Sequence, residues 1–127
     1  MEKNNRFLID THIFIWWMEK SKSLSWDRYE LLSDPAMQIF LSVASIWEMV
    51  IKENTKKLKF SINLEEGIKA SGFTLLPITL PHVLALQELP LHHNDPFDRI
   101  LLAQTKVEKL TFISGDAKMK NYDITLL

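Results

Sequence analysis

Apolar residues in this chain form short continuous runs, which are separated by longer stretches of mixed apolar and polar residues. Short apolar runs bounded by polar or turn residues are typical of buried strands, whereas the longer stretches are long enough for helices. The runs that predict strands are residues 6–10 (RFLID), 38–42 (QIFLS), 73–78 (FTLLPI), 110–113 (LTFI) and 124–127 (ITLL). The stretches that predict helices are residues 12–19, 23–34, 43–52, 64–71, 80–89 and 96–108. Alternation of strands with helices favours an α/β layer fold with a mainly parallel sheet.

Proline and glycine mark several of the expected element ends. Pro35 stops the second predicted helix because it cannot continue one, and Gly72 is the expected stop of the fourth. Pro77 cannot donate a ladder hydrogen bond, so the third predicted strand should end there or lie at the sheet edge.

Length and residue usage limit the class of protein. The chain has 127 residues, which supports one core, and we predict a single domain over residues 1–127. It has no cysteine, which excludes a disulfide scaffold, a thiolate metal site and a cysteine nucleophile. No apolar run approaches the roughly 20 residues of a membrane span, and the N-terminus has no signal-peptide pattern. We therefore expect a soluble, cytoplasmic protein without membrane contact.

Charge and glycine content exclude three further classes. Fifteen Lys and Arg against sixteen Asp and Glu give a formal net charge of -1, which excludes a strongly basic, non-specific nucleic-acid binder. The glycines at positions 67, 72 and 115 cannot form either glycine-rich phosphate loop. Dinucleotide binding and P-loop hydrolysis are therefore not expected.

Two acidic residues follow predicted strands. Asp10 comes directly after the first strand, and Asp116 follows the fourth through the small pair Ser114 and Gly115. Aspartate is common in turns and helix caps, which accounts for either residue alone. Ligands of open parallel sheets bind beyond the carboxyl ends of the strands, however, so two acids at two such ends favour a functional site.

A third acid, Glu48, lies within the apolar helix predicted over residues 43–52. Three apolar residues mark one face of this helix: Ala44, Trp47 and Ile51. Three polar residues fall together at spacings of three and four: Ser45, Glu48 and Lys52. One interpretation is a solvated stripe in which Glu48 and Lys52 form an exposed ion pair. The alternative directs the stripe at the cleft beyond the strand ends.

The segment Asp95-Pro96-Phe97-Asp98 opens the last long helix. Asp95 and Pro96 suit the N-cap and first helical positions, and Asp98 then lies near the positive end of the helix dipole. Both acids thus have a structural explanation. Asp98 could also face inward, because the residues that follow it are mostly apolar.

Carboxylates gathered in one pocket raise each other's pKa, and a hard divalent cation relieves this repulsion. Mg²⁺ and Mn²⁺ prefer carboxylate and water oxygens. Such a site suits hydrolysis of a phosphodiester, because the metal activates a water and stabilises the leaving oxygen.

Four segments together resemble the acidic blocks of PIN-domain ribonucleases, and more narrowly those of VapC-type toxins. They are LIDTHIFIWW, SVASIWEMVIK, HHNDPFDRILLAQ and LTFISGDAKMK, and they span nearly the whole chain in the family's order. The resemblance implies a Rossmann-like α/β/α sandwich and Mg²⁺- or Mn²⁺-dependent endonucleolytic cleavage of RNA. It also implies a homodimer and a cognate antitoxin protein that blocks the site.

Carried onto this chain, the resemblance implies four catalytic, metal-binding acids: Asp10, Glu48, Asp98 and Asp116. It implies supporting roles for Thr11 beside the first acid and Ser114 before the last, and Asp95 supports the site by its N-cap position. A polyanionic substrate needs local positive charge, and lysines near the acids are candidates for phosphate contact: Lys52, Lys56 and Lys118.

Other features have structural interpretations. His92 and His93 lack the companion ligands of a zinc site, so we interpret them as loop residues. Three tryptophans fit either the core or a partner face, since tryptophan is common at interface hot spots: Trp16, Trp17 and Trp26.

Two other function classes stay open on the residues alone. One is a phosphoryl-transfer protein, such as a phosphatase or receiver-like module, although position 12 is histidine rather than a second aspartate. The other is a catalytically silent α/β binding module whose acids only cap helices.

Overall fold

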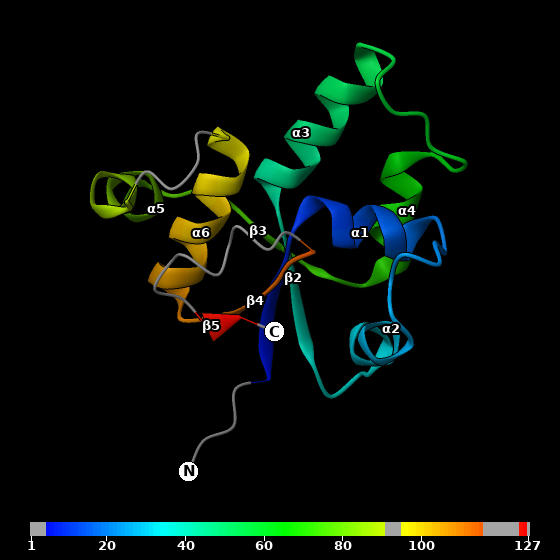
Figure 1. Cartoon of the computed structure of the whole chain (residues 1–127), viewed down its shortest axis with the longest axis horizontal. Coiled ribbons are helices and arrows are strands. Elements are labelled where there is room, and N and C mark those ends of the chain that lie inside the picture. Colours follow the sequence, from blue (N-terminus) through cyan, green and yellow to red (C-terminus); the bar gives the residue numbers. More distant parts are fainter. Residues whose placement is uncertain (1–4, 91–94, 116–124, 127) are drawn as a thin grey trace.

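The computed structural model describes residues 5–90, 95–115 and 125–126. Within this part, five strands form one sheet in the order β3-β2-β1-β4-β5, and every neighbouring pair is parallel (Figure 1). The strands are β1 (Arg6–Ile9), β2 (Gln38–Ser42), β3 (Thr74–Leu76), β4 (Thr111–Ile113) and β5 (Thr125–Leu126). The predicted parallel α/β architecture is confirmed.

Helices cover both faces of the sheet. They are α1 (Thr11–Met18), α2 (Trp26–Ser33), α3 (Val43–Asn54), α4 (Leu64–Ser71), α5 (Leu80–Ala85) and α6 (Pro96–Glu108), with a short 3₁₀ turn η1 (Leu86–Glu88) after α5. Figure 1 shows α1, α2 and α4 on one side of the sheet and α5 and α6 on the other. Among the described residues, no helix is long and apolar enough to span a membrane.

The core has two parts because strand side chains alternate between the two faces of the sheet. Leu8 and Phe112 pack with the apolar residues of α6, whereas Ile9 and Ile113 pack with Phe14 and other residues of the α1 side. The layers are therefore helix, sheet and helix, as the resemblance implied.

Strand register places several chain segments at one edge of the sheet. Ile9 at the end of β1 pairs with Leu41 of β2 and with Ile113 of β4. The residues that leave β1 and β4 are Asp10 and Ser114, and the Asp10 N–H donates to the Ile113 carbonyl at 3.0 Å. This edge, formed by the carboxyl ends of the three central strands, is where the acids were expected to meet.

The helices and strands end close to the predicted proline and glycine positions, with small differences. Gly72 ends α4 in the left-handed conformation with φ of 70°, and Pro77 follows β3, which is an edge strand. The helix predicted over residues 80–89 is shorter than expected, because α5 ends at Ala85 and the chain tightens into a 3₁₀ turn. Of the last predicted strand, residues 124 and 127 lie outside the described residues.

The burial of the α3 side chains contradicts one of the two interpretations of this helix. Its polar stripe is buried: Ser45 is 0% exposed and Glu48 is 5% exposed. Of the three residues that mark the apolar face, Ala44 is buried, but Trp47 and Ile51 are 58% and 39% exposed. The solvated-stripe interpretation is therefore wrong, and the stripe points into the protein near the end of β1.

Candidate active site

Asp10 lies at the junction between β1 and α1, where it caps the helix. Its Oδ1 accepts a hydrogen bond from the Ile13 N–H at 2.8 Å, and its Oδ2 accepts one from the Gly115 N–H at 3.2 Å. The side chain of Ser114 also bonds to this carboxyl. Asp10 is therefore held by both of its oxygens, from its own helix and from the loop after β4.

Asp10 is buried, with 4% of the residue exposed. Burial raises its pKa above the ordinary value of 3.8, and the hydrogen bonds from its neighbours offset only part of this shift. The hydrogen bonds from the described groups thus do not fully offset the cost of burying this negative charge. A nearby cation would stabilise the charged form of the carboxylate.

Thr11 connects the strand end to helix α3. Its hydroxyl donates to Oε1 of Glu48 at 2.7 Å and lies 3.0 Å from the Ser45 hydroxyl. All three residues are buried. Because Thr11 is the neighbour of Asp10 in sequence, this network places the Glu48 carboxylate next to the β1 end.

The second oxygen of Glu48 has a charged partner. Lys52, one helical turn later, places Nζ 2.7 Å from Glu48 Oε2. The Lys52 side chain is 35% exposed and the Glu48 side chain 7% exposed. The expected exposed ion pair is therefore corrected: the pair exists, but its carboxylate is buried and only the lysine reaches solvent.

Asp95 and Asp98 occupy the start of α6, as predicted. Asp95 is exposed, and its Oδ1 accepts from the N–H groups of Phe97 at 2.9 Å and Asp98 at 3.2 Å. Asp98 is half-buried in the first helical turn. The Phe97 ring packs edge-on against Trp47 with centroids 5.1 Å apart, so the start of α6 adjoins the helix that carries Glu48.

The structure joins four of the polar residues by side-chain hydrogen bonds, and these are Thr11, Ser45, Glu48 and Lys52. Asp10 is linked to them as the sequence neighbour of Thr11. Ser114 joins them through Asp10. Lys56 is exposed beyond the end of α3 and has a positive φ of 61°. The predicted residues Asp116 and Lys118, and the pair His92 and His93, lie outside the described residues.

The residues present fit a hard divalent cation. Asp10 and Glu48 offer carboxylate oxygens, which are the ligand type that Mg²⁺ and Mn²⁺ prefer. The raised pKa of Asp10 indicates a carboxylate that such an ion would stabilise. Within residues 5–90, 95–115 and 125–126, no three acidic, histidine or cysteine side chains lie close enough to hold an ion by themselves.

Two contributors were missed by sequence reasoning. Ser45 was recognised only as part of a stripe, although its position three residues before Glu48 is the signal that places both on one face. Gly115 supplies a backbone N–H to Asp10, and the Trp16 ring leaves no room for a larger residue, since an added Cβ would lie 2.9 Å from the ring edge. No local pattern reveals a requirement of this kind.

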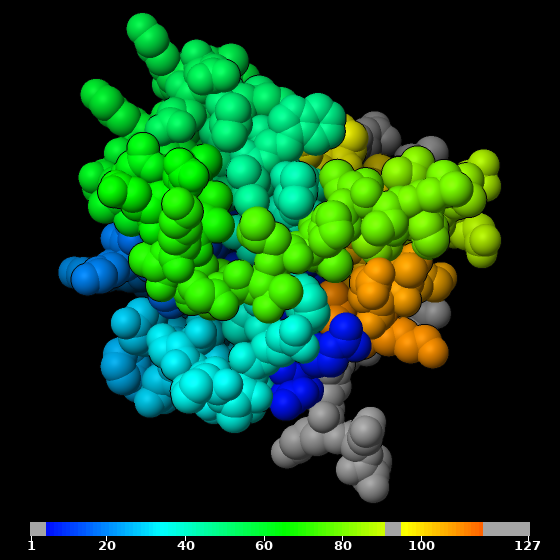
Figure 2. All heavy atoms as spheres, turned by 180° about the vertical axis from the view of Figure 1, so that it is seen from behind, coloured from blue at the N-terminus to red at the C-terminus, as the bar shows by residue number. Residues whose placement is uncertain are grey.

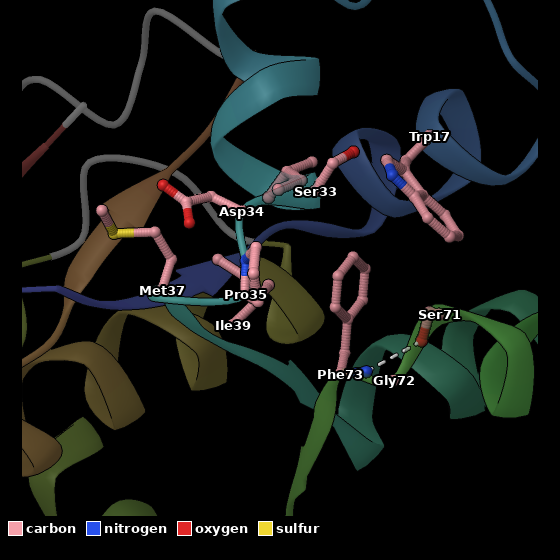
Figure 3. Close-up of a pocket in the computed structure, with 10 residues that line it drawn as sticks. Trp17, Ser33, Asp34, Pro35, Met37, Ile39, Ser71, Gly72 and Phe73 are labelled. Carbon is pink, nitrogen blue, oxygen red and sulfur yellow. Dashed lines mark hydrogen bonds between the residues drawn. The ribbon is translucent and has the colours of Figure 1, made fainter.

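A cavity of about 370 Å³ lies away from the acids, between α1, α2 and the start of β3 (Figure 3). Trp17 and Phe73 line it, with ring centroids 5.1 Å apart, and the Trp17 Nε1 is buried without a hydrogen-bond partner among the described residues. Trp17 also packs near Phe14 in the core. Trp26, by contrast, is 68% exposed and stacks on Tyr29.

Helices α3 and α5 also carry exposed apolar side chains. Figure 2 shows α3 and α5 on the same face of the molecule. The exposed apolar side chains of the two helices are those of Val43, Trp47, Val50, Ile51, Leu80, Val83 and Leu84.

In this parallel α/β/α sandwich, buried carboxylates lie at the carboxyl edge of the central strands, where open parallel sheets bind their ligands. The chain belongs to the PIN domain family, whose model matches residues 7–124.

Solved structures share this fold. VapBC2 from Rickettsia felis, bound to a DNA fragment from its promoter, is 17% identical over 96% of this chain and 97% of that chain, with a TM-score of 0.72. DNA-bound VapBC from Salmonella typhimurium is 12% identical over 96% of both chains, with a TM-score of 0.69. No curated protein matches the sequence.

Proposed function

We propose that this protein is a metal-dependent endoribonuclease and the toxin of a toxin–antitoxin pair. The single observation that carries this proposal is the pair of buried carboxylates, Asp10 and Glu48, at the carboxyl edge of the sheet. Thr11 follows Asp10 in the chain and donates a hydrogen bond to Glu48. Membership of the PIN domain family and the shared fold with two VapBC structures support it.

In this proposal four acids would hold Mg²⁺ or Mn²⁺: Asp10, Glu48, Asp98 and Asp116. When bound, the ion supplies Lewis-acid stabilisation of phosphate and an activated water. The chain's own groups hold the donors in place beforehand. The N–H groups of Ile13 and Gly115 orient the Asp10 carboxylate, and the Thr11 hydroxyl orients that of Glu48.

Asp95 acts on the site through the helix. Its carboxylate accepts the first N–H groups of α6 and so stabilises the turn that presents Asp98. We assign it a supporting role rather than a place among the metal ligands. The RNA phosphates would contact lysines around the acids, for which Lys52, Lys56 and Lys118 are the candidates.

Two kinds of partner complete the proposal. The antitoxin would dock on the α1–α2 side, where the exposed Trp26 ring, stacked on Tyr29, offers apolar surface. A second copy of the chain would dock on the exposed apolar residues of α3 and α5, because large exposed apolar patches mark interaction surfaces. Sedimentation of the purified chain tests the homodimer.

Cleavage of a panel of structured RNAs with Mg²⁺ or Mn²⁺ tests the activity. The wild type should cleave, whereas Asp10→Asn and Asp98→Asn should lose at least about 100-fold in rate, as expected when charge stabilisation at the reacting phosphate is removed. Asp27→Asn removes an exposed acid from the first turn of α2 and should match the wild type. Equal rates in all four proteins would disprove the acidic site and indicate a contaminating nuclease.

A further inference from the structure

Lys52 occupies an unusual place for a surface lysine. Its ammonium lies 2.7 Å from a carboxylate oxygen whose side chain is 7% exposed, while its own side chain is 35% exposed. The other oxygen of Glu48 accepts from Thr11 at 2.7 Å. Both oxygens of this carboxylate are therefore engaged by groups of the chain itself.

These two partners differ in charge. The Thr11 hydroxyl is neutral, so it orients Glu48 without neutralising it. Lys52 brings a full positive charge, which a buried carboxylate needs, because an uncompensated buried charge is strongly destabilising. Lys52 thus does for Glu48 what a divalent cation would do in the proposed active site.

We propose that Lys52 is a positioning residue that serves as an internal counter-cation for Glu48 and competes with the divalent metal for it. The inference rests on the function proposed above. An ammonium and a metal ion on the same carboxylate repel each other, so metal binding at Glu48 displaces Lys52. The long, flexible side chain can move its ammonium into solvent, which is open to a third of it.

The direction of the change in metal affinity distinguishes a competing cation from a group that only supports a metal ligand. A group that only orients a metal ligand strengthens metal binding, and removing it weakens the affinity by about 10- to 100-fold. A competing cation weakens metal binding, so removing it tightens the affinity. We expect Lys52→Met to lower the apparent Kd for Mn²⁺ by about fivefold, the factor for loss of a partly exposed ion pair.

The experiment is calorimetric titration of the full chain with Mn²⁺ alone at neutral pH and low salt. Lys52→Met and Lys52→Gln should both bind Mn²⁺ more tightly than the wild type, and Lys52→Arg should restore the wild-type affinity. Lys56→Met removes the same charge from an exposed position beyond the same helix and should leave the Kd within about twofold. In EDTA, Lys52→Met should also have a lower Tm than the wild type, and Mn²⁺ should raise its Tm by the larger amount.

Each outcome decides the question. Unchanged or weaker Mn²⁺ binding in Lys52→Gln, which keeps a hydrogen-bond donor and so guards against misfolding, would overturn the competition. Equal tightening in Lys56→Met would assign the effect to general charge and would overturn it too. A wild type that binds no Mn²⁺ would refute the proposed function itself, whereas normal binding that is insensitive to Lys52 would refute only this inference.

Discussion

Replacing Thr11 with valine removes the hydroxyl that links the end of β1 to Glu48 while keeping the shape of the side chain. The lost hydrogen bond is 2.7 Å long, joins two buried residues and ends on a carboxylate. Hydrogen bonds to charged groups contribute about 1.5–3 kcal/mol, and the abandoned carboxylate oxygen stays buried. We therefore expect Thr11→Val to lower the free energy of unfolding by about 1.5–3 kcal/mol.

The same loss can be expressed as a change in Tm. With an unfolding entropy of about 2.1 cal/mol/K per residue, 127 residues give roughly 4 °C of Tm for each kcal/mol. Thr11→Val should thus melt about 6–11 °C below the wild type when both are measured in EDTA by circular dichroism. Urea unfolding at 25 °C should give the matching change in free energy without a change in slope.

Thr105→Val is the matched control. Thr105 is equally buried, and its hydroxyl donates to the Leu101 carbonyl at 2.9 Å, but that carbonyl also accepts the helical N–H one turn later. Its loss should cost less than about 1 kcal/mol. Equal losses in the two variants would refute the reasoning, because they would show that Thr11 stabilises the carboxylate no more than Thr105 stabilises a carbonyl that already has a partner. A double-mutant cycle of Thr11→Val with Glu48→Gln should show a coupling of about 1–2 kcal/mol.

Three further predictions concern Asp10, Gly115 and Trp26. Because the pKa of Asp10 is raised, the folded state binds its proton more strongly than the unfolded state, so this carboxyl costs stability as pH rises past 3.8. The Tm gain on adding Mn²⁺ should therefore grow between pH 4 and pH 7. A gain that is absent at every pH would instead indicate a silent module. Gly115→Ala should lower the free energy of unfolding in urea by about 1–3 kcal/mol, since its Cβ would lie 2.9 Å from the Trp16 ring. Replacing that ring in Trp16→Leu should recover part of the loss, whereas additive losses in the double variant would contradict the clash. Trp26→Ala should change stability by less than about 0.5 kcal/mol yet weaken antitoxin binding at least about fivefold in calorimetry, whereas unchanged affinity would place the antitoxin elsewhere.

Most element positions could be predicted because they follow from local patterns. The ranges 38–42 and 64–71 coincide with β2 and α4, since apolar runs and capping residues lie next to each other along the chain. Asp10 was recognised for the same reason, because it directly follows a strand in a parallel sheet. The shortened α5 is a difference of detail, since no residue between 80 and 89 forbids a longer helix.

The orientation of α3 could not be predicted. Hydrophobicity alone favours burying Trp47 and exposing Glu48, and the structure does the opposite. Burial of a carboxylate is tolerated only with hydrogen-bonding or charged partners, and one of these partners lies 37 residues away at Thr11. The polar stripe was visible in the sequence, but its direction was not.

By itself, the sequence determined the alternation of strands and helices and the positions of acids at their junctions, because these depend on neighbours along the chain. Only the tertiary structure decided which of those residues meet. The order β3-β2-β1-β4-β5 places the ends of β1 and β4 together and lets Gly115 donate to Asp10 across 105 residues of sequence. Such contacts arise from parallel strand register and helix packing, in which residues far apart in the chain share one edge of the sheet.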